Sequence, residues 1–246
     1  MAALVVRGLS KSYGGVQALR SVSFRVAAGE LVAMIGPNGA GKTTCFNLLN
    51  GQLAPDAGEI ELDGQPLAGR APRDIWRLGV GRTFQITATF GSMSVRENVQ
   101  MALLSHERRL SSPFAAFSAL AAAEADALLA RVGMQQEAGK PCAELAYGDL
   151  KRVELAMALA SSPRLLLMDE PTAGMAPEER GELMTLAAGL ARSEGIAVLF
   201  TEHDMDVVFG HADRVMVLHS GELIASGTPA EIQADPRVQE VYLGAA

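Results

Sequence analysis

A glycine-rich run near the N-terminus has the residue types and spacing of a phosphate-binding loop. It fits the pattern G-x-x-x-x-G-K-[ST] and consists of Gly36, Pro37, Asn38, Gly39, Ala40, Gly41, Lys42, Thr43 and Thr44. In such a loop the backbone N–H groups form a concave anion site, and the glycines let the backbone approach the phosphates. Lys42 would reach the β- and γ-phosphates, and the hydroxyl of Thr43 would be a ligand of Mg²⁺. The run therefore predicts binding of a nucleoside triphosphate.

Two flanking segments must position this loop. Residues 31–35 are apolar and predict a short buried strand, whereas residues 45–50 predict the start of a helix. A strand that leads through such a loop into a helix is the context in which the motif binds phosphate, because the helix N-terminus adds partial positive charge. This context favours a nucleotide site over a glycine-rich turn that binds nothing.

A pair of carboxylates offers a second piece of the same chemistry. Four apolar residues, 165–168, precede Asp169 and Glu170 and predict a buried strand that ends in the two acids. The first carboxylate would lie beside Mg²⁺, usually through a water, and the second would face a water that attacks the γ-phosphate. An acidic pair exposed at a strand end is the alternative, but a preceding phosphate loop favours the catalytic interpretation.

The remaining pattern predicts an α/β core with a mostly helical insert. Strands are expected at residues 4–7, 22–26, 59–62, 196–201 and 214–218, and helices at 177–191, at 205–211 and at the C-terminus. Between about residues 95 and 160 the sequence changes to alanine, leucine and charged residues at helical spacing. The alanine-rich stretch 114–132 contains Glu124, Asp126 and Arg131, which favours a packed amphipathic helix over a membrane segment.

Composition limits the class of protein. The chain has 246 residues, 49% of them hydrophobic, and no apolar run approaches the ~18 residues of a spanning helix. The N-terminus lacks the pattern of a signal peptide. Two cysteines, Cys45 and Cys142, indicate neither a disulfide framework nor a zinc site. A formal charge of −7 argues against nucleic acid as a partner.

Other nucleotide-binding classes share the first motif but not the later residues. A small GTPase should carry Asn-Lys-x-Asp, and none of the asparagines begins that motif. A protein kinase has a glycine loop of different construction. The chain instead resembles the ATP-binding-cassette (ABC) ATPases over essentially its whole length.

The resemblance implies roles for individual residues. Tyr13 resembles the aromatic residue that stacks on adenine, and Gln85 the glutamine that senses Mg²⁺ and the membrane partner. Asp169 and Glu170 resemble the metal-side and the catalytic carboxylates, and His203 the histidine that contacts the γ-phosphate. The implied metal ligands are thus Thr43, Gln85 and Asp169, and the catalytic residues are Glu170, His203 and Lys42.

The same resemblance implies the fold class. We expect an α/β protein with a P-loop NTPase (RecA-like) core, an N-terminal antiparallel β subdomain and a helical insert subdomain. Residues 1–246 would form a single ABC ATPase domain, in which 1–94 and 161–246 make the β subdomain and core, and 95–160 make the helical subdomain with the signature helix.

The signature segment departs from the family pattern. Residues 145–149, Leu-Ala-Tyr-Gly-Asp, occupy the place of the usual Leu-Ser-Gly-Gly-Gln. In the family this segment binds the γ-phosphate held by the opposite subunit, so Gly148 would act in trans. Ala146 supplies no hydroxyl, whereas Asp149 suits a helix N-terminus as a cap but would repel a phosphate. Ala176 stands where the family commonly places an aspartate.

These departures resemble one subgroup, the branched-chain amino-acid uptake ATPases. The resemblance rests on Leu-Ala-Tyr-Gly, on residues 81–85 (Gly-Arg-Thr-Phe-Gln), on residues 94–99 and on the ending 241–244. It implies an ATPase with ATP and Mg²⁺ as cofactors, a second ATPase subunit (a copy or a different chain), two integral-membrane permease subunits and, indirectly, a solute-binding protein. The location would be peripheral, at the cytoplasmic face of the inner membrane.

Three functions remain open. The first is the ATPase of an importer for branched-chain amino acids or related solutes such as urea, amides or aromatic acids. The second is the ATPase of a lipid or lipopolysaccharide extractor, which the tyrosine-containing signature disfavours. The third is a non-transport ABC ATPase, which usually carries two cassettes or a long coiled coil.

Overall fold

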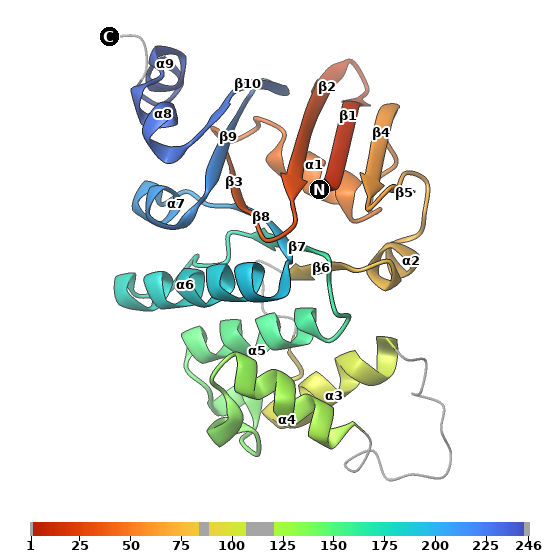
Figure 1. Ribbon diagram of the computed structural model, residues 1–246, viewed down its shortest axis with the longest axis vertical. Coiled ribbons are helices and arrows are strands. Elements are labelled where there is room, and N and C mark those ends of the chain that lie inside the picture. The colour runs from red at the N-terminus through yellow and green to blue at the C-terminus, as the bar shows by residue number, and fades with distance from the viewer. Residues whose placement is uncertain (1, 84–88, 107–120, 244–246) are drawn as a thin grey trace.

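The structure, a computed structural model, describes residues 2–83, 89–106 and 121–243. It contains two sheets with helices packed against them (Figure 1). A four-stranded antiparallel sheet has the order β2-β1-β4-β5, with β1 (Ala2–Tyr13), β2 (Val16–Ala27), β4 (Ala57–Leu62) and β5 (Gln65–Pro66). The expected N-terminal antiparallel sheet is thereby confirmed, and β4 and β5 form a hairpin around Asp63 and Gly64.

The second sheet carries the phosphate loop. Its order is β10-β9-β3-β8-β7-β6, with β3 (Leu31–Ile35), β6 (Val80–Thr83), β7 (Leu165–Asp169), β8 (Ala197–Thr201), β9 (Arg214–His219) and β10 (Glu222–Gly227). β3 pairs in parallel with β8 and β9, β8 pairs in parallel with β7, and β7 with β6, so the ends of β3, β7 and β8 meet at one edge. That edge is where ligands bind in open α/β sheets. The predicted α/β core is confirmed.

Three elements of this part were missed from the sequence. β6 was not expected, nor was helix α2 (Pro72–Arg77) before it. The residues after β9 were expected to be helical, but they form β10 before helices α8 (Pro229–Ala234) and α9 (Pro236–Leu243). β10 pairs antiparallel with β9 around the turn at Ser220-Gly221, so partner strands rather than local periodicity define it.

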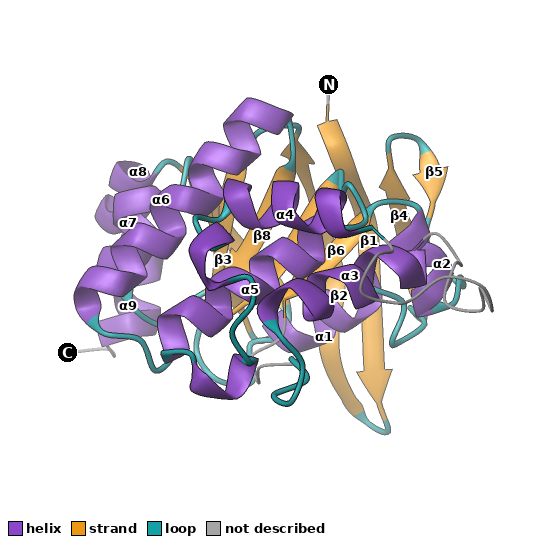
Figure 2. Ribbon diagram, turned by 90° about the horizontal axis from the view of Figure 1, so that it is seen from below, coloured by secondary structure: helices purple, strands orange, loops and turns teal. Residues whose placement is uncertain are grey.

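Helices α3 (Val95–His106), α4 (Ala122–Arg131) and α5 (Tyr147–Leu159) make the helical insert. In Figure 2, seen from below, these helices lie in front of the strands. Helix α4 buries Ala125, Leu128 and Leu129, as expected for a packed amphipathic helix, while residues 107–120 lie outside the described part. The expected boundaries at 94/95 and 160/161 stay a prediction.

The segment 94–99 has a structural reason for its residue types. Ser94 and Glu97 form reciprocal hydrogen bonds at the start of α3, with Ser94 N donating to Glu97 Oε2 (2.7 Å) and Glu97 N donating to Ser94 Oγ (3.2 Å). The hydrogen bonds that Ser94 N and Ser94 Oγ (2.9 Å) donate to the Glu97 carboxylate lower the pKa of Glu97. Asn98 is fully buried; its Oδ1 accepts from Phe90 N (2.7 Å) and its Nδ2 donates to Phe90 O (3.1 Å). The segment therefore fixes the entry into the helical insert.

Three further helices belong to the core. α1 (Lys42–Leu49) packs under the phosphate loop, and α6 (Pro177–Glu194) and α7 (Met205–His211) flank β7 and β8. Both cysteines are free and buried, and burial raises the pKa of the Cys45 thiol to about 12. The prediction that they form no disulfide is confirmed. No helix within residues 2–83, 89–106 and 121–243 is long and apolar enough to cross a membrane.

Candidate active site

The loop between β3 and α1 has a backbone path that only glycine allows at two positions. Gly36 has φ 155°, and a Cβ there would lie 2.0 Å from the carbonyl oxygen of Leu218. Gly41 has φ 108°, and a Cβ there would lie 2.5 Å from the carbonyl oxygen of Ala18. The loop is therefore pressed against β9 and β2, and α1 begins at Lys42, earlier than residue 45 where the sequence suggested it.

Lys42 lies folded over this loop. Its Nζ donates to the carbonyl oxygens of Gly36 (2.6 Å) and Pro37 (3.2 Å), and only 8% of the residue is exposed. Burial lowers the pKa of Lys42, while the carboxylates of Glu170 and Asp169 act in the opposite direction. No ion pair to Lys42 is present within the described residues, so this ammonium group would gain from a phosphate beside it.

A pocket of about 180 Å³ collects most of the predicted residues. It is lined by Ala18, Asn38, Gly39, Ala40, Gly41, Lys42, Thr43, Thr44, Glu170 and His203. Residues from the loop after β3, from the end of β7 and from the end of β8 thus meet in one place, although they are far apart in the sequence.

Glu170 is held in an unusual backbone conformation at the end of β7. It has φ 48°, a value that costs a non-glycine residue about 1–3 kcal/mol and persists only where the surroundings impose it. Its N–H donates to the carbonyl oxygen and to Oγ1 of Thr201, both at 3.1 Å. Its Oε1 lies 2.9 Å from Nε2 of His203. The strand ends of β7 and β8 therefore place the carboxylate and the imidazole in direct contact.

Asp169 lies next to this pair and both its oxygens are engaged. Oδ1 accepts from Thr201 Oγ1 (2.8 Å), and Oδ2 accepts from Arg82 Nη2 (3.1 Å). The contacts fix the orientation of the carboxylate relative to the loop. Neither Thr201 nor Arg82 was assigned a role from the sequence.

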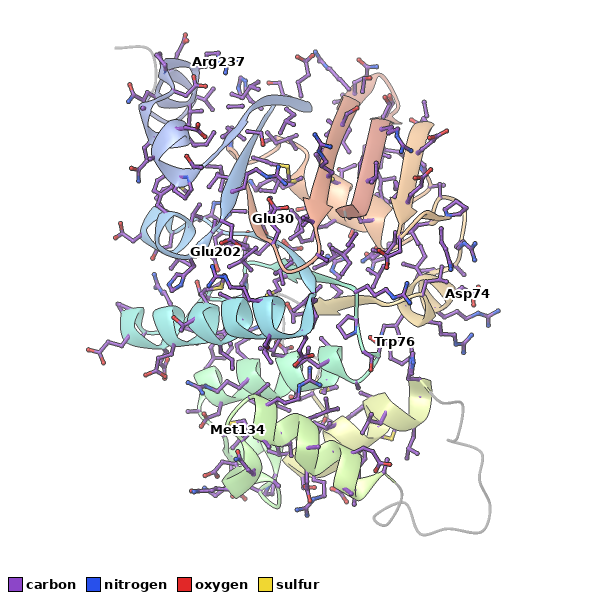
Figure 3. The ribbon with its side chains drawn as sticks, in the orientation of Figure 1. Glu30, Asp74, Trp76, Met134, Glu202 and Arg237 are labelled. Atoms are coloured by element: carbon purple, nitrogen blue, oxygen red, sulfur yellow. The ribbon has the colours of Figure 1, made fainter. Side chains whose placement is uncertain are left out.

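The loop that follows Glu170 is tied to the residue before His203. Glu202 is buried, and its Oε1 accepts from the N–H (2.8 Å) and Oγ1 (2.7 Å) of Thr172. Figure 3 labels Glu202 in the region between α6 and α7. This contact keeps the segments after β7 and β8 at a fixed separation, so Glu170 and His203 stay opposite each other.

The comparisons with known proteins agree with this geometry. Residues 19–173 match the family described as "ABC transporter", and residues 222–246 match "Branched-chain amino acid ATP-binding cassette transporter". The chain is 40% identical over 252 residues to "High-affinity branched-chain amino acid transport ATP-binding protein LivG" of Salmonella typhimurium, with 99% of this chain and 98% of LivG covered. It is 38% identical over 253 residues to BraF of Pseudomonas aeruginosa, at the same coverage.

A solved structure shares the fold over the full length. The ADP conformation of MJ1267, "an ATP-binding cassette of an ABC transporter", superimposes with a TM-score of 0.88 at 29% identity and 100% coverage of both chains. The chain belongs to the ABC transporter family of ATP-binding cassettes. It is accordingly a nucleotide-binding ATPase cassette, as the phosphate loop and acidic pair predicted.

Tyr13, assigned to adenine, and Gly148, assigned to the opposite ATPase subunit, do not line the 180 Å³ pocket. Tyr13 ends β1 and is 47% exposed, so it is accessible but does not line the pocket. Gln85 lies outside the described residues. Gly148 lies in the first turn of the signature helix α5. A Cβ added at Gly148 would lie 3.2 Å from the carboxylate of Glu179.

The signature helix corrects one expectation. Helix α5 begins at Tyr147, not near residue 150, and Ala146 is its N-cap without a side-chain hydrogen bond. Asp149 is therefore not the cap; it lies in the first turn, where the helix dipole favours an acidic residue without a capping hydrogen bond.

The donor groups of the cassette fit Mg²⁺. Thr43 lines the pocket with a hydroxyl, and Asp169 directly precedes the pocket residue Glu170. In the described part of the chain no cluster of three or more His, Cys, Asp or Glu could hold a metal alone. Mg²⁺ at phosphate sites is usually held by one or two protein oxygens together with substrate phosphates and water. A hydroxyl and a carboxylate near a phosphate loop are a donor set of that kind.

Proposed function

We propose that this cassette is the ATP-hydrolysing subunit of an importer for branched-chain amino acids or related small solutes. The observation that carries the proposal is the match to LivG over nearly the whole of both chains, supported by the C-terminal match at residues 222–246. The related solutes of this proposal are urea, amides and aromatic acids. A lipid extractor and a non-transport ATPase receive no support from the named relatives.

The pocket residues have matching roles in this proposal. Adenine would stack on Tyr13, and the loop from Gly36 to Thr44 would bind the phosphates. Lys42 would contact the β- and γ-phosphates. Thr43, Gln85 and Asp169 would hold Mg²⁺, which supplies charge neutralisation of the phosphates when bound.

The two contacting side chains at the strand ends would serve the transfer step. Glu170 would orient or deprotonate the attacking water, and His203 would stabilise the γ-phosphate. Phosphoryl transfer depends on such positioning and charge stabilisation more than on covalent chemistry.

A second pocket supports a membrane partner. It has a volume of about 340 Å³ and lies between α2, β6, α3 and α5, where the core meets the helical insert. Apolar side chains line much of it, including Ile75, Trp76 and Met157; Figure 3 labels Trp76 on α2. Thr83, the last described residue before Gln85, is also part of its wall. We assign this pocket to a segment of a permease subunit, and the cassette would then lie at the cytoplasmic face of the inner membrane.

Reconstitution with candidate membrane subunits tests the function. The purified complex is inserted into liposomes, and ATP is supplied on the side of the membrane that carries the cassette. Transport of radiolabelled leucine or a related solute to that side, against its gradient, is expected when the solute-binding protein is present. Export of lipid from the same liposomes, or co-purification with no membrane subunit at all, would contradict the proposal.

The signature segment also predicts a different chain as the second ATPase subunit. Two carboxylates, Asp149 and Glu179, lie at or beside the first turn of α5, and Ala146 offers no hydroxyl there. These charges oppose a triphosphate presented by an identical subunit. We therefore expect a heterodimer with two unequal ATP sites, and the isolated chain should remain monomeric with ATP.

The mass of the isolated chain in solution distinguishes a heterodimer-forming subunit from one that forms a homodimer. The Glu170→Gln protein is purified alone, mixed with Mg-ATP at micromolar concentration and measured by light scattering. A monomer is the expected result. A stable homodimer with ATP in both sites would show that the Gly148 backbone and the helix dipole suffice, and the heterodimer proposal would be wrong.

A further inference from the structure

Arg82 makes contacts that none of the assigned roles uses. It lies in β6, the edge strand beside β7, and only 13% of its side chain is exposed. Nη2 donates to Asp169 Oδ2 (3.1 Å), whereas Nη1 donates to Asn47 Oδ1 (2.9 Å) and to Gln52 Oε1 (3.3 Å). One guanidinium group therefore connects the end of β7 with helix α1 and the segment after it.

The contact with Asn47 reaches the phosphate loop through one turn of helix. Asn47 follows Thr43 by four residues in α1, so both side chains lie on the same helix face. Arg82 thus bridges the face of α1 that carries the Thr43 hydroxyl and the carboxylate of Asp169, the two groups proposed to share Mg²⁺.

Together with Thr201, Arg82 fixes the plane of the Asp169 carboxylate. Thr201 donates to Oδ1 and Arg82 donates to Oδ2, so each oxygen has one donor and keeps lone pairs for water or metal. Hydrogen-bonded partners of a metal-binding carboxylate orient it, and their loss typically lowers metal affinity or activity about 10- to 100-fold. The planar guanidinium can hold Asp169 and Asn47 at once, which the single ammonium of lysine does less well.

The same side chain forms part of the wall of the 340 Å³ pocket between α2, β6, α3 and α5. A group that occupies this pocket therefore lies against the residue that holds Asp169. Arg73, on α2, lines the same pocket but pairs only with the exposed Asp74 among the ion pairs of the described residues. Both arginines line the pocket, but only Arg82 contacts Asp169, so a comparison of variants at the two positions distinguishes the effect of each contact.

We infer that Arg82 is a positioning residue for Asp169, which aligns this carboxylate with the Thr43 face of α1 and links it to the pocket proposed for the permease segment. The link to the pocket rests on the proposed function, whereas the alignment of Asp169 belongs to the cassette alone. Two measurements therefore test the two parts separately.

The first measurement uses the full-length purified chain and ADP, without membrane subunits. Calorimetric titration gives the affinity for ADP with Mg²⁺ and with EDTA, and the ratio of the two is compared between wild type and variants. Arg82→Ala should lower the ratio about 10-fold and leave the affinity in EDTA unchanged, because the phosphate loop is intact. Arg82→Lys should give a ratio between those of wild type and Arg82→Ala. Arg73→Ala should give the wild-type ratio.

Asn47→Ala provides a second variant, which keeps the bond between Arg82 and Asp169 but removes the link to α1. It should lower the ratio less than Arg82→Ala does. An equal loss of affinity with Mg²⁺ and with EDTA in Arg82→Ala would indicate a general structural defect and overturn the positioning role. A higher ratio would show that Arg82 acts only as a competing positive charge, which also overturns it.

The second measurement uses the assembled transporter in liposomes. Solute-dependent stimulation of ATP hydrolysis should be largely lost in Arg82→Lys, while co-purification with the membrane subunits persists. Full stimulation in Arg82→Lys, alongside a lowered Mg²⁺ ratio in the isolated chain, would overturn the link to the pocket and leave the positioning of Asp169. Loss of co-purification in wild type itself would contradict the proposed function and not the role of Arg82 toward Asp169.

Discussion

Lys42→Ala is expected to abolish ATP turnover. The ammonium group lies buried against the carbonyl oxygens of Gly36 and Pro37, where a phosphate would be its natural counter-ion. Charge-assisted hydrogen bonds of this kind are worth roughly 1.5–3 kcal/mol each, so loss of contacts to two phosphates corresponds to a fall of about 10²- to 10⁴-fold. Turnover is measured in the complex with the partner subunits, by release of inorganic phosphate.

Lys140→Ala is the matched control for this variant. Lys140 pairs with Glu137 on the exposed surface, and exposed pairs contribute at most about 1 kcal/mol. It should therefore retain normal turnover. Near-normal ATPase activity in Lys42→Ala, with thermal unfolding unchanged, would contradict the assignment of the phosphate loop and with it the nucleotide site.

Glu170→Gln is expected to keep ATP affinity while turnover collapses. The substitution removes the charge and changes the shape little, so the strained backbone at φ 48° and the contacts with Thr201 can persist. The amide oxygen can still face Nε2 of His203. General bases contribute about 10²- to 10⁴-fold, which sets the size of the loss. ATP-bound dimers with the partner ATPase should accumulate and are detected by gel filtration.

Asp169→Asn provides the comparison that distinguishes the two carboxylates. Asp169 is bonded to Arg82 and Thr201 and does not line the pocket, so its amide variant should impair Mg²⁺-dependent nucleotide binding more than the transfer step. If Asp169→Asn traps the dimer while Glu170→Gln hydrolyses normally, the two roles are assigned the wrong way round.

The elements that the sequence predicted well are those with strong local signals. Residues 31–35 form β3 and residues 205–211 form α7, with the bounds that the pattern indicated. A fully buried parallel strand is a continuous apolar run, and the phosphate loop carries glycine at Gly36 and Gly41, where a Cβ would clash with neighbouring backbone. Both signals lie within a few residues, so the phosphate loop could be identified without its surroundings.

The missed elements depend on partners that are distant in the chain. β6 has only four residues and contains Gly81 and Arg82, so it becomes a strand through pairing with β7. β10 likewise exists as an antiparallel partner of β9. Neither pattern has the length or the alternation that distinguishes a strand from a turn or a helix end.

For this protein the sequence by itself determined the phosphate loop and the carboxylate pair, because each is a run of contiguous residues, and it determined the cassette family through several such short motifs. Only the tertiary structure decided how the side chains meet. The contact between His203 and Glu170 spans 33 residues, and that between Arg82 and Asp169 spans 87. Such contacts follow from the parallel order of β6, β7 and β8, which brings the strand ends to one edge of the sheet. Strand order is set by packing among distant segments, so no local pattern contains it.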